Sequence, residues 1–287
     1  MICFPNAKIN LGLNVVSKRT DGYHNIETVF YPIPVKDALE IVNAEKLSFT
    51  QTGIQVDAPM EKNLVIKALN LLKTQYEIPP LEIHLLKAIP FGAGLGGGSA
   101  DAAFMLKLLN DFCKLDIHAD ELEKIAASIG ADCPFFIRNT PVFATGTGNI
   151  FEPVELSLKG YHFCLIKPDV AVSTPEAYSL VTPKVPAISL KDIINKPVSE
   201  WKNLMVNDFE KSLQQTSGYR SDQRNTLPGW GHLRFYVWVR FLRIRIVRST
   251  DSVQRAIHRL FCMGGTITMN VIAGFFDALA DRWDELC

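Results

Sequence analysis

The 287-residue sequence has no apolar run long enough to span a membrane, and residues 1–6 do not have the pattern of a secretory signal. It also has no net charge, because 30 lysines and arginines balance 30 aspartates and glutamates. That balance argues against a protein dedicated to binding nucleic acid or a membrane surface. We therefore expect neither of them as a partner.

Closely spaced cysteines are missing as well. The six cysteines lie far apart and include no C-x-x-C pair: Cys3, Cys113, Cys133, Cys164, Cys262 and Cys287. Cysteines that bind zinc or form small disulfide frameworks are grouped more closely. The sequence therefore predicts reduced, mostly buried thiols in a cytoplasmic protein, and no metal site made of cysteines.

The most informative segment that is present runs over residues 90–100 and has five glycines between Gly92 and Gly98. Residues 99–110 directly after it have the apolar spacing of a helix. A glycine loop that opens a helix presents backbone N–H groups and the positive end of the helix dipole to an anion, most often a phosphate. It matches neither the Walker pattern nor a dinucleotide-binding unit. A flexible linker is the alternative, but linkers are not flanked by a strand-like run (residues 81–89) and an alanine-rich helix.

A predicted strand near the N-terminus carries the first candidate cation. Apolar residues alternate from Ile9 to Val15, so the opposite face carries Lys8, Asn10 and Asn14. Lys8 is either a surface residue whose ammonium reaches solvent or a fixed cation near a phosphate or a reacting hydroxyl.

Asp132 is the candidate carboxylate. It follows a predicted helix at residues 119–129, which Gly130 suits as a cap and which Pro134 prevents from continuing. Such an aspartate either caps a turn or is a half-buried carboxylate that needs a partner, for which Lys8 is the candidate.

Two aromatic residues follow a predicted Asp21-Gly22 turn. Taken singly, Tyr23 and His24 are more often core or surface residues than ligand contacts. Together they make a plausible platform for stacking on a base and hydrogen bonding to it. Further predicted elements are strands at residues 28–33, 38–42 and 81–86 and a helix at 63–76, and the 47% of hydrophobic residues suffices for a sizeable core.

At these positions the sequence resembles the GHMP small-molecule kinases. Their second motif is similar to Pro90-x3-Gly94-Leu95-Gly96-Gly97-Gly98-Ser99-Ala100. Residues 6–11, 21–24, 63–64 and 130–134 resemble segments of those GHMP kinases that phosphorylate a cytidine-diphosphate-linked methylerythritol. The resemblance extends from about residue 4 to residue 210.

The resemblance implies transfer of the γ-phosphoryl group of ATP to the 2-hydroxyl group of that substrate, in the non-mevalonate route to isoprenoids. Asp132 would be the catalytic base, and Lys8 would keep it ionised and offset charge at the reacting centre. Homoserine and mevalonate kinases are sibling alternatives, against which the Asp-Gly-Tyr-His segment argues.

The resemblance also implies which residues contact each substrate. Asn63, Leu64 and Lys87 would lie near the adenine. Tyr23 and His24 would form the platform for the cytosine, and Asn10 and Thr174 would make polar contacts on the substrate side. The ATP phosphates would lie on the glycine loop, with Ser99 near a Mg²⁺ ion; the residues of this loop are Pro90, Phe91, Gly92, Ala93, Gly94, Leu95, Gly96, Gly97, Gly98, Ser99 and Ala100.

The implied fold is α+β with two domains. Residues 1–155 would form an ATP-binding domain similar to domain 2 of ribosomal protein S5, and residues 156–215 would begin a ferredoxin-like domain that is disrupted after about residue 215. Residues 216–287 form an aberrant tail. The oligomeric state is left open.

Lysine is absent from that tail. Only Arg19 and Arg138 precede residue 218, whereas residues 218–287 contain ten arginines and three of the four tryptophans. Arg243 and Arg245 alternate with isoleucines, as on a half-exposed strand. The functional interpretation of this pattern is a basic surface patch that binds nucleic acid. Neither interpretation explains so abrupt a change in lysine and arginine usage.

A slip of the coding frame between about residues 212 and 217 does explain it. Codons permitted for residues 230–243, read one base later, spell Gly-Ala-Ile-Tyr-Ala-Ser-Met-Ser-Gly-Ser-Gly-Ser-Ser, which resembles the third glycine-rich motif of the GHMP kinases. Read in the same way, Met269 followed by Asn270 gives a stop codon. We therefore interpret residues 218–269 as a frame-shifted kinase C-terminus and 270–287 as read-through. With this tail the chain is either the kinase or a catalytically impaired, nucleotide-binding remnant of it.

Overall fold

The computed structural model describes residues 1–55, 59–167, 174–209, 243–247 and 270–275. They fall into two compact units. The first unit comprises Met1–Ile9 and Val35–Val142, and the second comprises Asn10–Pro34 and the described residues from Phe143 onward. The domain boundaries expected at residues 155 and 215 stay predictions.

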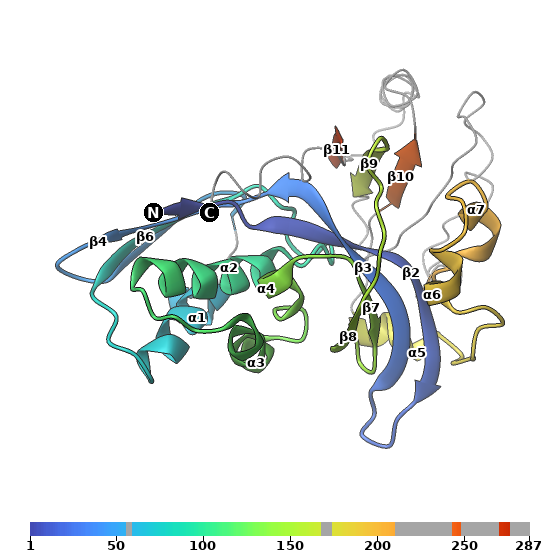
Figure 1. Ribbon diagram of the computed structural model, residues 1–287, viewed down its shortest axis with the longest axis horizontal. Coiled ribbons are helices and arrows are strands. Elements are labelled where there is room, and N and C mark those ends of the chain that lie inside the picture. The colour runs from blue at the N-terminus through green and yellow to red at the C-terminus, as the bar shows by residue number, and fades with distance from the viewer. Residues whose placement is uncertain (56–58, 168–173, 210–242, 248–269, 276–287) are drawn as a thin grey trace. The chain divides into compact units, whose positions relative to one another are not determined.

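The first unit contains a four-stranded sheet in the order β1-β4-β6-β5 (Figure 1). β4 pairs antiparallel with β1 and with β6, whereas β5 runs parallel to β6. Alternate residues of β6 are buried, beginning with Leu81, as expected for a strand with one face in the core. The strands expected at residues 38–42 and 81–86 are confirmed by β4 and β6; the bounds are β1 Ile2–Cys3, β4 Ala38–Asn43, β5 Ser48–Gly53 and β6 Leu81–Lys87.

Helices of the first unit lie on one face of this sheet (Figure 1). The central helix α2 packs against α1, α3 and α4 and contacts β1 and β4. The three helices expected in this region are confirmed, although α1 ends earlier than expected, at Lys73. The bounds are η1 Met60–Lys62, α1 Leu64–Lys73, α2 Gly97–Phe112, α3 Ala119–Ile129 and α4 Phe135–Arg138.

Asp37, Lys87 and Asp101 form a buried charged cluster in the first unit. The Lys87 Nζ contacts Oδ2 of Asp37 and lies 2.7 Å from Oδ2 of Asp101. Burial lowers the pKa of Lys87, but the two carboxylates outweigh burial and raise that pKa overall. Burial raises the pKa of Asp101 to about 7, against the opposing effect of Lys87. One cation thus faces two carboxyl groups, and the Asp101 carboxyl group is protonated at acidic pH.

The second unit is built around two long strands, β2 and β3, which continue into a sheet of order β2-β3-β7-β8. Residues 6–9 of β2 belong to the first unit. Leu13, Val15 and Ile26 form a core cluster against which Tyr178 and Phe209 pack. The bounds are β2 Asn6–Lys18, β3 His24–Lys36, β7 Val142–Thr145, β8 Ile150–Pro153, α5 Thr174–Ser179, α6 Leu190–Ile193 and α7 Trp201–Leu204.

A three-stranded sheet in the second unit has β9 (His162–Lys167) at its centre. β10 (Arg243–Val247) and β11 (Asn270–Phe275) each pair antiparallel with it. β10 contains Arg243 and Arg245, whose alternation with isoleucines was one interpretation of this segment. The remainder of the tail, on which the frame-shift interpretation rests, lies outside the described residues.

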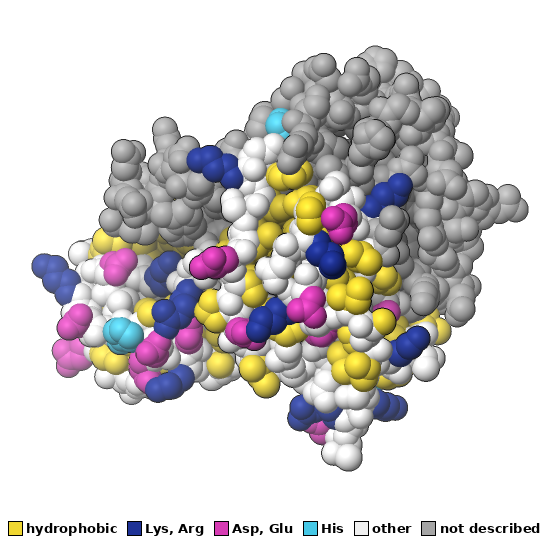
Figure 2. Space-filling model, turned by 45° about the vertical axis from the view of Figure 1, so that its right-hand side comes forward, with side chains coloured by type: hydrophobic (Ala, Val, Ile, Leu, Met, Phe, Trp, Pro, Cys, Tyr) yellow, Lys and Arg dark blue, Asp and Glu magenta, His cyan; other side chains and the backbone are white. Residues whose placement is uncertain are grey.

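Charges of both signs are mixed on the face of the molecule in Figure 2, where Lys and Arg side chains lie among Asp and Glu side chains. This mixing agrees with the balanced composition of the chain. Within the part of the chain that the structure describes, no helix is both long enough and apolar enough to cross a membrane.

The charged cluster predicts how Asp101→Asn changes the pH dependence of stability. From about pH 4 to about pH 7 the unfolded chain loses the Asp101 proton while the folded chain keeps it, so folding stability falls as the pH rises. Asparagine does not ionise, and the variant lacks this loss. We expect its free energy of unfolding, relative to the unchanged chain, to increase by about 1–3 kcal/mol from about pH 5 to about pH 8, at ~1.4 kcal/mol per pKa unit.

Urea unfolding at both pH values measures this difference. Asp111→Asn, which changes an exposed aspartate of the same helix, is the matched control and should follow the unchanged chain. If the free energies of unfolding of Asp101→Asn and of the unchanged chain change by the same amount between the two pH values, the raised pKa of Asp101 is contradicted.

Candidate active site

The glycine loop connects β6 to α2 in a conformation that requires its glycines. Gly92, Gly94 and Gly96 have φ angles of 71°, 71° and 72°, in the left-handed region that other residues rarely adopt. The intervening Ala93 and Leu95 are buried and fix the loop to the core. At Gly96 a Cβ atom would lie 2.8 Å from the Phe136 ring, so the glycine is also required by the close approach of that ring.

The loop leaves its hydrogen-bond donors uncommitted. The backbone N–H groups of residues 92–96 find no acceptor within the part of the chain that the structure describes. Those of the first turn of α2 follow directly, and a Cβ atom on Gly98 would lie only 3.6 Å from Leu64, the first residue of α1. A row of free donors and the N-terminus of α2 therefore follow one another here, which is an arrangement that binds an anion.

Lys8 and Asp132 form an ion pair in the first unit. The Lys8 Nζ lies 3.4 Å from Oδ2 of Asp132, and the two side chains are 5% and 34% exposed. The Lys8 backbone N–H donates to the Leu95 carbonyl at 2.9 Å, so the strand that carries the cation is bonded to the glycine loop. The structure thus brings together the loop, the cation and the carboxylate that the sequence singled out.

Asp132 is held by the segment between α3 and α4. Gly130 caps α3 with an extended backbone, and its N–H donates to the Ala126 carbonyl. The Cys133 thiol is buried, which raises its pKa to about 11 against the opposing effect of the Ser99 side chain in α2. This thiol is therefore protonated at neutral pH and lies beside the helix that follows the loop.

A buried amide pair supports the same region from the other side. Asn6 and Asn139 exchange hydrogen bonds of 3.3 and 2.6 Å between their side-chain amides. Asn6 begins β2 two residues before Lys8, and Asn139 follows α4 with a φ of 56°. The pair joins the strand of Lys8 to the helix that follows Asp132.

The Asp132 carboxylate is partly exposed. Its interaction with Lys8 is an ion pair, and within the described residues its side chain caps no turn. A carboxylate that is paired with a buried ammonium and one-third exposed can accept a proton from a bound hydroxyl group. No group of three or more His, Cys, Asp or Glu side chains in the described residues could hold a metal ion.

The residues expected near adenine have different surroundings. Asn63 caps α1, since its Oδ1 accepts from the Val65 N–H at 2.9 Å, and Leu64 lies beside Gly98 of the loop. The Lys87 ammonium is buried between Asp37 and Asp101.

The residues expected on the substrate side belong to the second unit. Tyr23 is 67% exposed after the turn that joins β2 and β3, and His24 stacks on Tyr178 with ring centroids 4.9 Å apart and 14° between the planes. Asn10 is buried and donates to the Thr28 hydroxyl at 3.1 Å. Thr174 is the first residue of α5, the helix that carries Tyr178.

Tyr178, Asp37 and Asp101 are the members of these sites that the sequence reasoning missed. Tyr178 lies in no glycine or proline motif, and Asp37 is far in sequence from Lys87. Asp101 offered a weak signal, because an ionisable residue among alanines on a helix that is buried over most of its length needs a partner.

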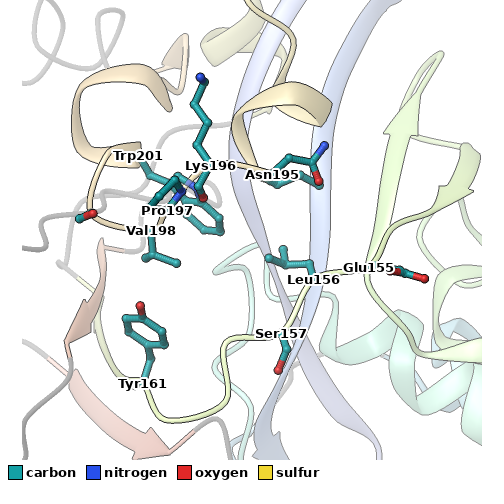
Figure 3. Close-up of a pocket in the computed structure, with 11 residues that line it drawn as sticks. Glu155, Leu156, Ser157, Tyr161, Asn195, Lys196, Pro197, Val198 and Trp201 are labelled. Carbon is teal, nitrogen blue, oxygen red and sulfur yellow. The ribbon is translucent and has the colours of Figure 1, made fainter.

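A cavity of about 620 Å³ lies elsewhere in the second unit (Figure 3). Trp201, Tyr161, Leu156, Val198 and Lys196 are among the residues that line it. None of the residues predicted from the sequence lines this cavity.

Comparison with known proteins agrees with this arrangement. The family described as "GHMP kinases N terminal domain" matches residues 63–140. A 4-diphosphocytidyl-2-C-methyl-D-erythritol kinase of Parabacteroides distasonis is 83% identical over 213 residues, which are 74% of this chain and 79% of that protein. The kinase of the same name from Bacteroides fragilis is 61% identical over 217 residues, with the same coverage.

Solved structures extend the comparison to the fold. A crystal structure of 4-(cytidine 5'-diphospho)-2C-methyl-D-erythritol kinase is 26% identical, with a TM-score of 0.77 over 96% of this chain and 98% of that one. The homoserine kinase of Cytophaga hutchinsonii is 17% identical with a TM-score of 0.63 over 96% and 94%, so it shares the fold alone. The mixed α and β structure expected from the sequence is confirmed as a GHMP kinase fold. The chain belongs to the 4-diphosphocytidyl-2-C-methyl-D-erythritol kinase family of the GHMP kinases.

Proposed function

We propose that the chain transfers the γ-phosphoryl group of ATP to the 2-hydroxyl group of 4-diphosphocytidyl-2-C-methyl-D-erythritol. The observation that carries this proposal is the Lys8–Asp132 pair beside a glycine loop with free N–H groups. The relatives with the same name, at 83% and 61% identity, support the choice of substrate. The reaction would take place in the cytoplasm, as the cysteine usage suggests, and would serve isoprenoid synthesis.

In the proposed mechanism the protein places charged and hydrogen-bonding groups beside the reacting atoms. Asp132 accepts the proton of the substrate hydroxyl as the hydroxyl oxygen attacks the γ-phosphorus. The bond between the γ-phosphorus and the β–γ bridging oxygen breaks, and ADP leaves. Lys8 holds the Asp132 carboxylate in place through their ion pair and offsets negative charge that develops on the transferred group. The N–H groups of residues 92–99 donate to phosphate oxygens in a fixed arrangement that needs no reorganisation during transfer.

ATP enters this proposal as its magnesium complex. The free N–H groups fit a triphosphate, and magnesium bound to ATP is held largely by phosphate oxygens and water. Of the protein groups, the Ser99 hydroxyl would lie near the ion. Asn63 and Leu64 would lie near the adenine, since Leu64 borders the loop at Gly98.

The substrate would be recognised by its cytosine. Tyr23 and His24 would form the platform for the base, and Tyr178 would extend it because its ring stacks on His24. Asn10 and Thr174 would make polar contacts with the remainder of the substrate. The oligomeric state has no part in the proposal.

The tail leaves two functional states open for the chain. We propose that residues 216–287 are aberrant, that 218–269 result from a frame slip, and that residues 156–215 begin the second domain. In support, similarity to the relatives covers 74% of the chain, although identity within that part reaches 83%. With this tail the chain is the kinase or a remnant that binds nucleotide without turnover.

An ADP-coupled assay tests the function. The kinase forms ADP only when 4-diphosphocytidyl-2-C-methyl-D-erythritol is present, and homoserine or mevalonate should give no increase. A remnant binds ADP but forms none from ATP. Release of ADP with homoserine or mevalonate alone would overturn the choice of substrate.

Asp132→Asn should lower kcat by about 10²- to 10⁴-fold, the usual contribution of a general base, with little change in the affinity for ADP. Lys8→Met removes the other member of the same ion pair and should also lower kcat. We therefore expect the kcat of the double variant to be about equal to that of the less active single variant. Steady-state kinetics on protein from a gene of verified sequence measures this.

The control is Asp111→Asn, which changes an exposed carboxylate of the first unit and should retain full kcat. Independent, multiplicative losses in the double variant would mean that Lys8 and Asp132 do not act as a unit.

Correction of the frame should raise activity. A chain whose gene is corrected between codons 212 and 217 regains the third glycine-rich motif, so its kcat should exceed that of the chain as written. Sequencing of the gene is the control. Equal activity of the two chains, or an intact frame whose codons do not spell that motif, would end the frame-shift interpretation.

A further inference from the structure

We propose that the buried cluster of Asp37, Lys87 and Asp101 positions the phosphate-binding loop by fixing both of its ends from inside the first unit. This inference rests on the proposed function, because it assumes that residues 92–99 hold nucleotide phosphates. It gives Lys87 a role through buried contacts, in place of direct contact with adenine.

The first end of the loop is fixed by Asp37. Its Oδ1 accepts from the N–H groups of Ala88 and Ile89, at 2.6 and 2.8 Å, and these are the first two residues after β6. The Asp37 backbone N–H donates to the Pro5 carbonyl at 2.8 Å. The start of the loop is therefore bonded, through one buried carboxylate, to the chain just before β2.

The second end of the loop is fixed by Asp101, which lies in the first part of α2. The Lys87 Nζ contacts both carboxylates, so the end of β6 is joined to Asp37 on one side and to α2 on the other. The loop closes tightly around this ammonium, since a Cβ atom on Gly97 would lie 3.4 Å from the Lys87 Nζ and 2.9 Å from Ile89.

The second carboxylate is not explained by stability alone. Asp37 by itself gives Lys87 an opposite charge, whereas Asp101 adds a desolvated carboxylate whose Oδ1 is buried without a hydrogen-bond partner among the described residues. Burying such a group is unfavourable. What Asp101 adds is the connection between the start of α2 and the end of β6.

This connection serves a loop that cannot fix itself. A segment with five glycines loses much conformational freedom when it is ordered, and residues 92–96 form no backbone hydrogen bond through their N–H groups within the described part of the chain. Anchors at both ends keep these N–H groups in place and free for phosphate oxygens. Preorganised donors bind more tightly than donors that must be ordered by the ligand.

Asp101→Ala tests the inference in the full chain, with ADP and adenosine as paired probes. The variant breaks the connection to α2, so its affinity for ADP should fall by about tenfold or more, as expected for misplaced phosphate donors. Its affinity for adenosine, which has no phosphate, should change less than about twofold, within the usual context dependence of single contacts. Asp101→Asn keeps an acceptor for Lys87 and should retain ADP affinity within about threefold.

Glu27→Ala is the matched control. Glu27 is a buried carboxylate of the second unit that accepts from the Leu190 N–H, and its loss should leave both affinities unchanged. Equal loss of ADP and adenosine affinity in Asp101→Ala, or no loss of either, overturns the positioning role. Failure of the unchanged chain to bind ADP instead contradicts the proposed function, so the two failures are distinguishable.

Hydrogen exchange on the unchanged chain gives a second test that no folding defect can obscure. The N–H groups of Ala88 and Ile89 should be protected with and without ADP, because Asp37 holds them. Those of residues 92–96 should be protected only with ADP. Exchange of Ala88 and Ile89 as fast as that of the loop, without ADP, overturns the inference.

Discussion

The ion pair between Lys8 and Asp132 is the interaction on which the rest of the account depends. A buried ammonium needs an opposite charge, and Asp132 supplies it while keeping one-third of its side chain exposed. Three further contacts involve the segments that carry Lys8 and Asp132. They are the Lys8 N–H bond to the glycine loop, the Asn6–Asn139 amide pair and the buried Cys133 beside Ser99. They hold the segments that carry the two charged side chains. The result is a carboxylate paired with an ammonium beside the glycine loop.

The loop combines two opposite requirements. Its backbone has to leave its N–H groups free for a ligand, and yet it has to keep one conformation. Left-handed glycines solve the first requirement, since they let the chain turn without side chains between the backbone and the ligand. Buried contacts on the far side of the loop, from Ala93 and Leu95 to the charged cluster of Lys87, solve the second. The loop thus keeps one conformation although its N–H groups donate to no other described residue.

Much of the first unit could be predicted from the sequence, because its signals are local. The spacing of apolar residues predicted α1, α2 and α3, and the glycines of residues 92–98 predicted the loop. The partnership of Lys8 with Asp132 was predicted from a chemical need, that of a half-buried carboxylate for a cation. Asp37 and Tyr178 could not be predicted in this way, since each acts through a contact between distant parts of the chain. Lys87 illustrates the same limit, because the sequence does not reveal that two carboxylates enclose its ammonium.

The central claim is that nucleotide phosphates bind to bare backbone beside Lys8 and Asp132. A crystal structure of the chain with a non-hydrolysable ATP analogue tests it most directly. The account predicts phosphate oxygens at about 2.7–3.2 Å from backbone nitrogens of residues 92–99, with the terminal phosphate next to Lys8 and Asp132. An analogue bound in the cavity beside Trp201, or with its phosphates away from the glycine loop, would contradict it.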